Sequence, residues 1–249
     1  MLRRFGPSHL LAKWRQLHNQ IDMSDLRDIF QDAENSQETQ RLKLPTEFIF
    51  LGGSNLPFEA RQALRYLLKR GITTEDIHFY KLGFCSEGEY RNRIIIPSYD
   101  EDGKLNYFIA RDIFPNSRFK YKNPPMSKDT VVFELFINWN EPIVLVEGSF
   151  DAIAVRKNVI PLLGKFPSKS LVKKLVTKRV KKVYVALDTD AKKDAAKLVK
   201  FLMDSGIEAY LLSMKEKDPS ELGFEEFWNR VKQTEQSTFS DIIRGKLYG

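Results

Sequence analysis

The sequence predicts an α/β protein in which a parallel β-sheet flanked by helices follows a smaller basic subdomain of mixed α+β type. Three observations support this fold class. After residue 141, short apolar runs alternate with helical segments, and this pattern is typical of a parallel sheet covered by helices. Before residue 141, two β-rich runs follow one another without a helix between them, as in a hairpin. At 249 residues the chain can bury a sizeable core.

The first elements are predicted to be an arm and two helices. Residues 1–44 end in the polar run QDAENSQETQR, and we expect an amino-terminal arm or linker there. A helix is predicted between Pro57 and Gly71, because the apolar residues between them recur with a helical period. Thr73 is expected to cap a shorter helix that follows.

A hairpin and a long loop complete the basic subdomain, which we assign to residues 45–140. Its two strands are predicted at residues 93–99 and 105–113, with DEDGK as the turn between them. Residues 115–129 contain three prolines and are predicted to form a loop.

The carboxyl-terminal half is predicted to be a second domain, residues 141–230, followed by a tail at 231–249. Strands are predicted at 143–148, 159–164, 182–188 and 207–213, and helices at 149–158, 168–180 and 191–206. Ligands of such sheets bind beyond the carboxyl ends of the strands.

Composition narrows the class of protein. Forty Lys and Arg against 33 Asp and Glu give a net charge of +7, which suits a polyanionic partner and equally a basic but unspecialised surface. With Cys85 as its single cysteine, the chain can form neither an internal disulfide nor a cysteine-rich zinc site. No apolar run approaches the length of a membrane span, so we expect a cytoplasmic protein without a membrane partner.

Acidic residues follow the apolar runs where ligands are expected. The acids are Glu147, Asp151, Asp188, Asp190 and Asp218. Crowded carboxylates repel one another unless a cation binds, so this pattern predicts a site for Mg²⁺ or Mn²⁺. The structural alternatives are stabilisation of a helix N-terminus by Asp151, a loop or helix-cap role for Asp188 and Asp190, and an ordinary turn at Asp218.

The three segments that contain these acids resemble the acidic motifs of the TOPRIM fold. They are VEGSFDAIA, ALDTDA and KDPSEL. Bacterial primases of the DnaG type share that fold with topoisomerases and some nucleases. The upstream segments resemble the amino-terminal half of the primase polymerase core in order and spacing: ALRYLLKRGITTEDIHFYKLGF, YRNRIIIPSYDEDGKLNYFIARD and FKYKNPP. The resemblance covers about residues 45 to 225.

This resemblance implies roles for individual residues. It makes Glu147, Asp188 and Asp190 catalytic, and these three acids together with Asp151 and Asp218 the metal ligands. Residues that match positions contacting nucleotide phosphates or template are Arg91, Arg93, Arg111, Lys120 and Lys122. Tyr121 and Asn123 interleave with these lysines and are expected to stack on or hydrogen-bond to single-stranded bases. A solvated charged loop is the alternative interpretation of this basic stretch.

The implied function is that of a DNA primase, which makes short RNA primers on single-stranded DNA from NTPs. One cysteine cannot supply the family's zinc-binding domain, so the resemblance is to a phage- or plasmid-type core, located in the host cytoplasm if phage-encoded. A replicative helicase and a separate zinc-binding or template-recognition protein are the expected partners. The sequence DTDAK lacks the glycines usual at the second acidic motif. A TOPRIM nuclease and a catalytically silent nucleic-acid-binding subunit of a replication or transcription complex therefore stay open.

Overall fold

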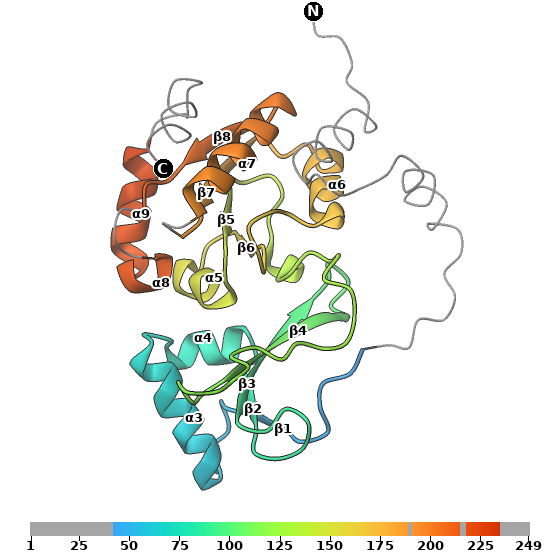
Figure 1. The fold of residues 1–249 in the computed structure, drawn as a ribbon, viewed down its shortest axis with the longest axis vertical. Helices are drawn as coiled ribbons and strands as arrows, with labels where there is room; N and C mark the ends of the chain where they lie inside the picture. The colour runs from blue at the N-terminus through green and yellow to red at the C-terminus, as the bar shows by residue number, and fades with distance from the viewer. Residues whose placement is uncertain (1–41, 189–190, 215–217, 235–249) are drawn as a thin grey trace, which may run out of the picture. The chain divides into compact units, whose positions relative to one another are not determined.

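The structure is a computed structural model that describes residues 42–188, 191–214 and 218–234. The predictions for Asp190, for most of the arm and for most of the tail lie outside these residues. From residue 44 on, the described residues form one compact unit, which contains two four-stranded sheets and the helices around them (Figure 1).

The first sheet is antiparallel and lies in the amino-terminal half. Its strands run in the spatial order β1 (Phe48–Phe50), β2 (Gly83–Cys85), β3 (Arg93–Tyr99) and β4 (Leu105–Asp112). The described part of this half also contains the α-helices α3 (Phe58–Lys69) and α4 (Thr74–Phe79). Thr73 caps α4 in a capping box with Asp76, as its position predicts. The hairpin of β3 and β4 is confirmed, with Gly103 at φ +76° in its turn.

The second sheet is parallel and lies in the carboxyl-terminal half. Its strands run in the order β6 (Val159–Pro161), β5 (Ile143–Val146), β7 (Lys182–Ala186) and β8 (Glu208–Leu211). The helices between and after the strands are α5 (Ser149–Val155), α6 (Lys169–Thr177), α7 (Lys192–Asp204), α8 (Pro219–Leu222) and α9 (Phe224–Gln233). The chain passes from β5 to one neighbour, β6, and later adds β7 on the other side. Crevices form at such reversals of strand order.

Several elements of the structure were missing from the prediction. The sequence interpretation missed β1 and β2, since three residues are too few to show a strand period. It also missed α9, whose buried Phe227 and Val231 anchor a helix that continues to Gln233, beyond the predicted start of the tail at residue 231. A short 3₁₀ helix, Glu134–Phe136, was not predicted either.

One apolar cluster joins the two sheets. It includes Ile94 and Ile109 of the antiparallel sheet together with Val144 and Val146 of the parallel sheet, and all four are at most 1% exposed. The division at residue 141 therefore separates two sheets that share a core, and as a domain boundary it stays a prediction.

Ion pairs also link the halves. Arg156 Nη2 lies 2.9 Å from Asp76 Oδ2, and Lys174 Nζ lies 2.6 Å from Glu134 Oε1. Asp76 and Glu134 are buried, so loss of Arg156 or Lys174 would leave a buried carboxylate without its cationic partner. Within the described ranges, no helix is long and apolar enough to cross a bilayer.

Candidate functional site

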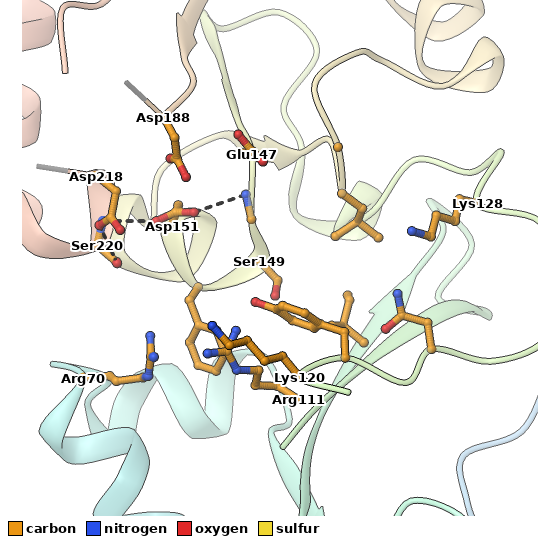
Figure 2. Close-up of a pocket in the computed structure, with 17 residues that line it drawn as sticks. Arg70, Arg111, Lys120, Lys128, Glu147, Ser149, Asp151, Asp188, Asp218 and Ser220 are labelled. Carbon is orange, nitrogen blue, oxygen red and sulfur yellow. Dashed lines mark hydrogen bonds between the residues drawn. The ribbon is translucent and has the colours of Figure 1, made fainter. Parts of the chain in front are cut away.

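A cleft of about 620 Å³ is lined by residues from both halves of the unit. Carboxylates line one side and define what we call the acidic edge: Glu147, Asp151, Asp188 and Asp218. Cations line the other side and define the basic wall: Arg70, Arg111, Lys120 and Lys128. Figure 2 shows the acidic edge above Arg70, Arg111 and Lys120, with Lys128 to one side. Opposite charges therefore face each other across one cleft.

The parallel sheet brings two of the acids together. Glu147 directly follows β5, and Asp188 lies two residues beyond the end of β7. These strands are neighbours, with Val146 paired to Ala186 at their carboxyl ends. Two residues distant in the sequence thus reach the same edge of the sheet, as the strand pattern predicts.

Asp151 is held by backbone N–H groups from two segments of the chain. Its carboxylate accepts hydrogen bonds from the backbone N–H of Gly148 at 3.2 Å and of Ser220 at 3.3 Å. A Cβ at Gly148 would lie 2.8 Å from Asp151 Oδ2, so glycine permits this close approach. Burial, followed by the charges of Asp218 and Asp188, raises the pKa of Asp151 to about 7. Asp151 is therefore both a helix-capping residue and a member of a crowded acidic cluster.

Asp218 is held by its own helix. It is the N-cap of α8, where its Oδ1 accepts from Glu221 N at 2.9 Å and from Ser220 Oγ at 2.8 Å. Pro219 occupies the first turn of that helix, a position that needs no backbone donor. The alternative for Asp218 was an ordinary turn, whereas the structure makes it a helix cap whose carboxylate also lines the cleft.

The chemistry of the donors fits Mg²⁺. All four side chains of the acidic edge offer oxygen atoms, the ligands that Mg²⁺ prefers. Among the residues that the structure describes, no group of three His, Cys, Asp or Glu side chains is close enough to form a metal cage. Mg²⁺ commonly uses only one or two carboxylates and completes its shell with water and phosphate. The acidic edge therefore suits an ion that arrives with a nucleotide.

The basic wall is built from aromatic and cationic side chains. Arg111, on β4, stacks on Tyr121 with its guanidinium carbon 4.7 Å from the ring centroid, and a backbone bridge joins the same two residues. Asn123 Oδ1 accepts from Ala110 N at 3.4 Å, which holds the loop beside β4. Arg70 lies over the Phe150 ring at 5.2 Å. The two ring contacts hold Arg111 and Arg70 in place without neutralising their charge.

Three predicted basic residues do not line this cleft. Arg93 is 7% exposed, forms an ion pair with Asp112 at 3.3 Å and donates to the Lys120 carbonyl at 3.4 Å. Lys122 pairs with Glu89 at 3.2 Å. Arg91 is exposed and precedes β3. The cleft instead includes Arg70 and Lys128, which sequence reasoning missed.

Ser149 and Ser220 are further cleft residues that sequence reasoning missed. Ser149 is 1% exposed, and its hydroxyl has no hydrogen-bond partner among the described residues. It is the first residue of α5, two residues after Glu147, so the acidic motif itself pointed to its neighbourhood. Ser220 lies two residues after Asp218, inside the KDPSEL motif, so that motif pointed to it in the same way, but its backbone contact with Asp151 arises only through folding.

We expect Arg93→Met to lower the free energy of unfolding by about 2 kcal/mol, because charged hydrogen bonds inside the protein are lost. Urea unfolding measures this change. The exposed Arg91→Met variant is the matched control and should unfold as wild type does. The slope of single-stranded DNA affinity against salt should stay unchanged in Arg93→Met. Unchanged stability with a slope reduced by about 1 would instead assign Arg93 a direct phosphate contact.

Comparisons with known proteins point in one direction. No protein-family profile matches the chain. The chain is 28% identical over 229 residues to the uncharacterized protein MG010 of Mycoplasma genitalium, covering 84% of this chain and 97% of that protein. It is 29% identical over 182 residues to the DNA primase of Clostridium acetobutylicum, covering 65% of this chain and 30% of that primase. The chain thus spans under a third of the primase it matches.

Solved structures show the same likeness. The zinc-binding and RNA polymerase domains of the Aquifex aeolicus primase match with a TM-score of 0.63 at 22% identity, covering 71% of this chain and 57% of that one. A DnaG primase catalytic domain bound to single-stranded DNA matches with a TM-score of 0.63 at 19% identity, covering 96% and 84%. The chain therefore has the fold of the DnaG-type primase catalytic core and is similar in sequence to DNA primases.

Proposed function

We propose that this protein is a DNA primase that makes short RNA primers on a single-stranded DNA template by metal-dependent nucleotidyl transfer. The observation that carries this proposal is the cleft in which the acidic edge faces the basic wall. Nucleotidyl transfer needs both signs of charge at once. Carboxylates hold cations, and fixed cations offset the charge of triphosphate and template.

Each side of the cleft has its own task in this proposal. Arg70, Arg111 and Lys120 would bind the phosphates of an incoming NTP and of the template. Glu147, Asp188 and the neighbouring carboxylates would hold Mg²⁺ or Mn²⁺, which when bound neutralises charge that develops on the phosphates. Arg111 is fixed by its stacking on Tyr121, so it would orient phosphate without first losing rotamer freedom.

Further parts of the proposal derive from the sequence. We assign the parallel sheet and its acids to the TOPRIM fold, with Asp190 as an additional ligand. The resemblance to a compact, phage- or plasmid-type core supports a cytoplasmic role beside a replicative helicase and a separate zinc-binding or template-recognition protein. The buried thiol of Cys85 is in keeping with a reducing compartment.

Primer synthesis tests the proposal directly. The protein is incubated with labelled NTPs, single-stranded DNA and Mg²⁺, with parallel reactions in Mn²⁺ and in EDTA. Oligoribonucleotides that require both template and metal support a primase. Shortened DNA would instead indicate a nuclease, and tight DNA binding without any product would indicate a silent binding subunit. Either of these two outcomes overturns the proposal.

A further inference from the structure

The loop that follows β4 exposes three large aromatic side chains within eight residues. Phe114, Phe119 and Tyr121 are 50%, 63% and 44% exposed, and we call them the aromatic strip. Full burial of a phenylalanine side chain is worth about 1.5–3 kcal/mol, and these rings forgo much of that gain. Clustered exposed aromatic rings mark a surface that binds something.

The strip is presented by a hydrogen-bonded loop. Asp112 N donates to the Lys120 carbonyl at 2.9 Å, and Lys122 N donates to the Ala110 carbonyl at 2.9 Å, so the returning chain runs beside β4. At the start of the loop, Phe114 N donates to Asp112 Oδ1 at 2.9 Å. Tyr121 also lines the cleft, so the strip begins at the cleft and continues along the chain to the exposed ring of Phe119.

Cations accompany the rings of this loop. The Arg118 guanidinium carbon lies 5.3 Å from the centroid of Phe119, and that of Arg111 lies 4.7 Å from the centroid of Tyr121. Lys120, between the two rings, lines the basic wall. Asp112, the last residue of β4, is paired with Arg93. An exposed ring beside a cation matches a nucleotide, whose base stacks while its phosphate pairs with the charge.

We propose that the aromatic strip is a stacking platform for single-stranded DNA, on which template bases lie as the strand passes to or from the cleft. This inference rests on the proposed function, since the bound strand is the template. An apolar protein partner is a poorer fit, because Arg118, Lys120 and Arg111 would have to be desolvated beside it. Bases in a duplex are already stacked, so the platform distinguishes single strands from duplexes.

Fluorescence anisotropy with a labelled oligodeoxythymidylate, in EDTA, tests the platform without catalysis. We expect Phe119→Ala to weaken single-strand binding about tenfold, the loss of one stacked base. Affinity for a duplex of the same length should not change, and the slope of affinity against salt should equal that of wild type, because no phosphate contact is removed. Phe119→Trp should restore binding. Phe58→Ala, at a 60% exposed phenylalanine on α3, is the matched control and should bind as wild type.

Three results would overturn the inference. The first is single-strand affinity of Phe119→Ala and Phe114→Ala equal to that of wild type. The second is an equal loss of affinity for single strands and duplexes. The third is a comparable loss in Phe58→Ala. Failure of the proposed function is distinguishable, since a protein that makes no primers can still bind single strands through Phe119.

Discussion

We expect Asp188→Asn to reduce primer synthesis at least about 10³-fold, because the substitution removes one of the charges with which the acidic edge binds cations. Asp188 lies beyond β7, beside Glu147 beyond β5, so its carboxylate faces any phosphate that occupies the cleft. Asparagine keeps the size of the side chain and changes its charge. The initial rate of labelled oligoribonucleotide formation at saturating NTP measures the effect.

The control for this variant is Asp102→Asn. Asp102 lies in the β3–β4 turn, where its highly exposed carboxylate pairs with Lys104, and its loss should leave primer synthesis within twofold of wild type. A folded Asp188→Asn protein that keeps more than a tenth of wild-type activity would remove Asp188 from the reaction. Single-strand binding in EDTA should survive in both variants.

The second large effect is a pH dependence of stability that originates at Asp151. Its pKa is about 7 in the folded protein and 3.8 in its ordinary state, so the unfolded chain releases the proton first. The contribution of Asp151 to the free energy of unfolding is therefore fully present below pH 3.8 and is lost as the pH rises toward 7. Between pH 5 and pH 8 in EDTA, the free energy of unfolding should fall by up to about 2.5 kcal/mol from this group alone.

Urea unfolding of wild type and Asp151→Asn at both pH values isolates this contribution. The variant cannot titrate at this position, so its free energy of unfolding should change less between pH 5 and pH 8 than that of wild type. Mg²⁺ should stabilise wild type more at pH 8, where the acids are ionised, than at pH 5. If the free energy of unfolding changed equally with pH in the two proteins, Asp151 would not be the source of the pH dependence.

Local sequence pattern predicted those elements whose signal is long enough to read. The strands β3 and β4 and the four parallel strands carry runs of apolar residues, and the capped helix at Thr73 carries a capping residue. By contrast, β1 and β2 are defined by pairing with each other and with β3, which no local pattern records. The sequence interpretation therefore predicted a hairpin where the structure has four strands.

The residues of the site also differ in whether local sequence could predict them. Acids at strand ends were predictable, because parallel strands deliver their carboxyl ends to one edge. Arg93 and Arg111 were indistinguishable as basic residues of paired strands. The register of β3 and β4 distinguishes their roles, because it places Arg93 opposite Asp112. Arg93 therefore forms an ion pair inside the protein and is not available to a ligand. Arg70 reaches the cleft only through the packing of α3, which leaves no trace in the residues around it.

The apolar cluster shared by the two sheets limits how far the cleft between them can open. Ile94, Ile109, Val144 and Val146 belong to one continuous interior, so moving the sheets apart would expose it at about 25 cal/mol per Å². We expect the width of the cleft to stay constant through a reaction cycle, which hydrogen exchange with and without NTP can check. Nucleotides would then enter and leave the cleft without any separation of the two sheets.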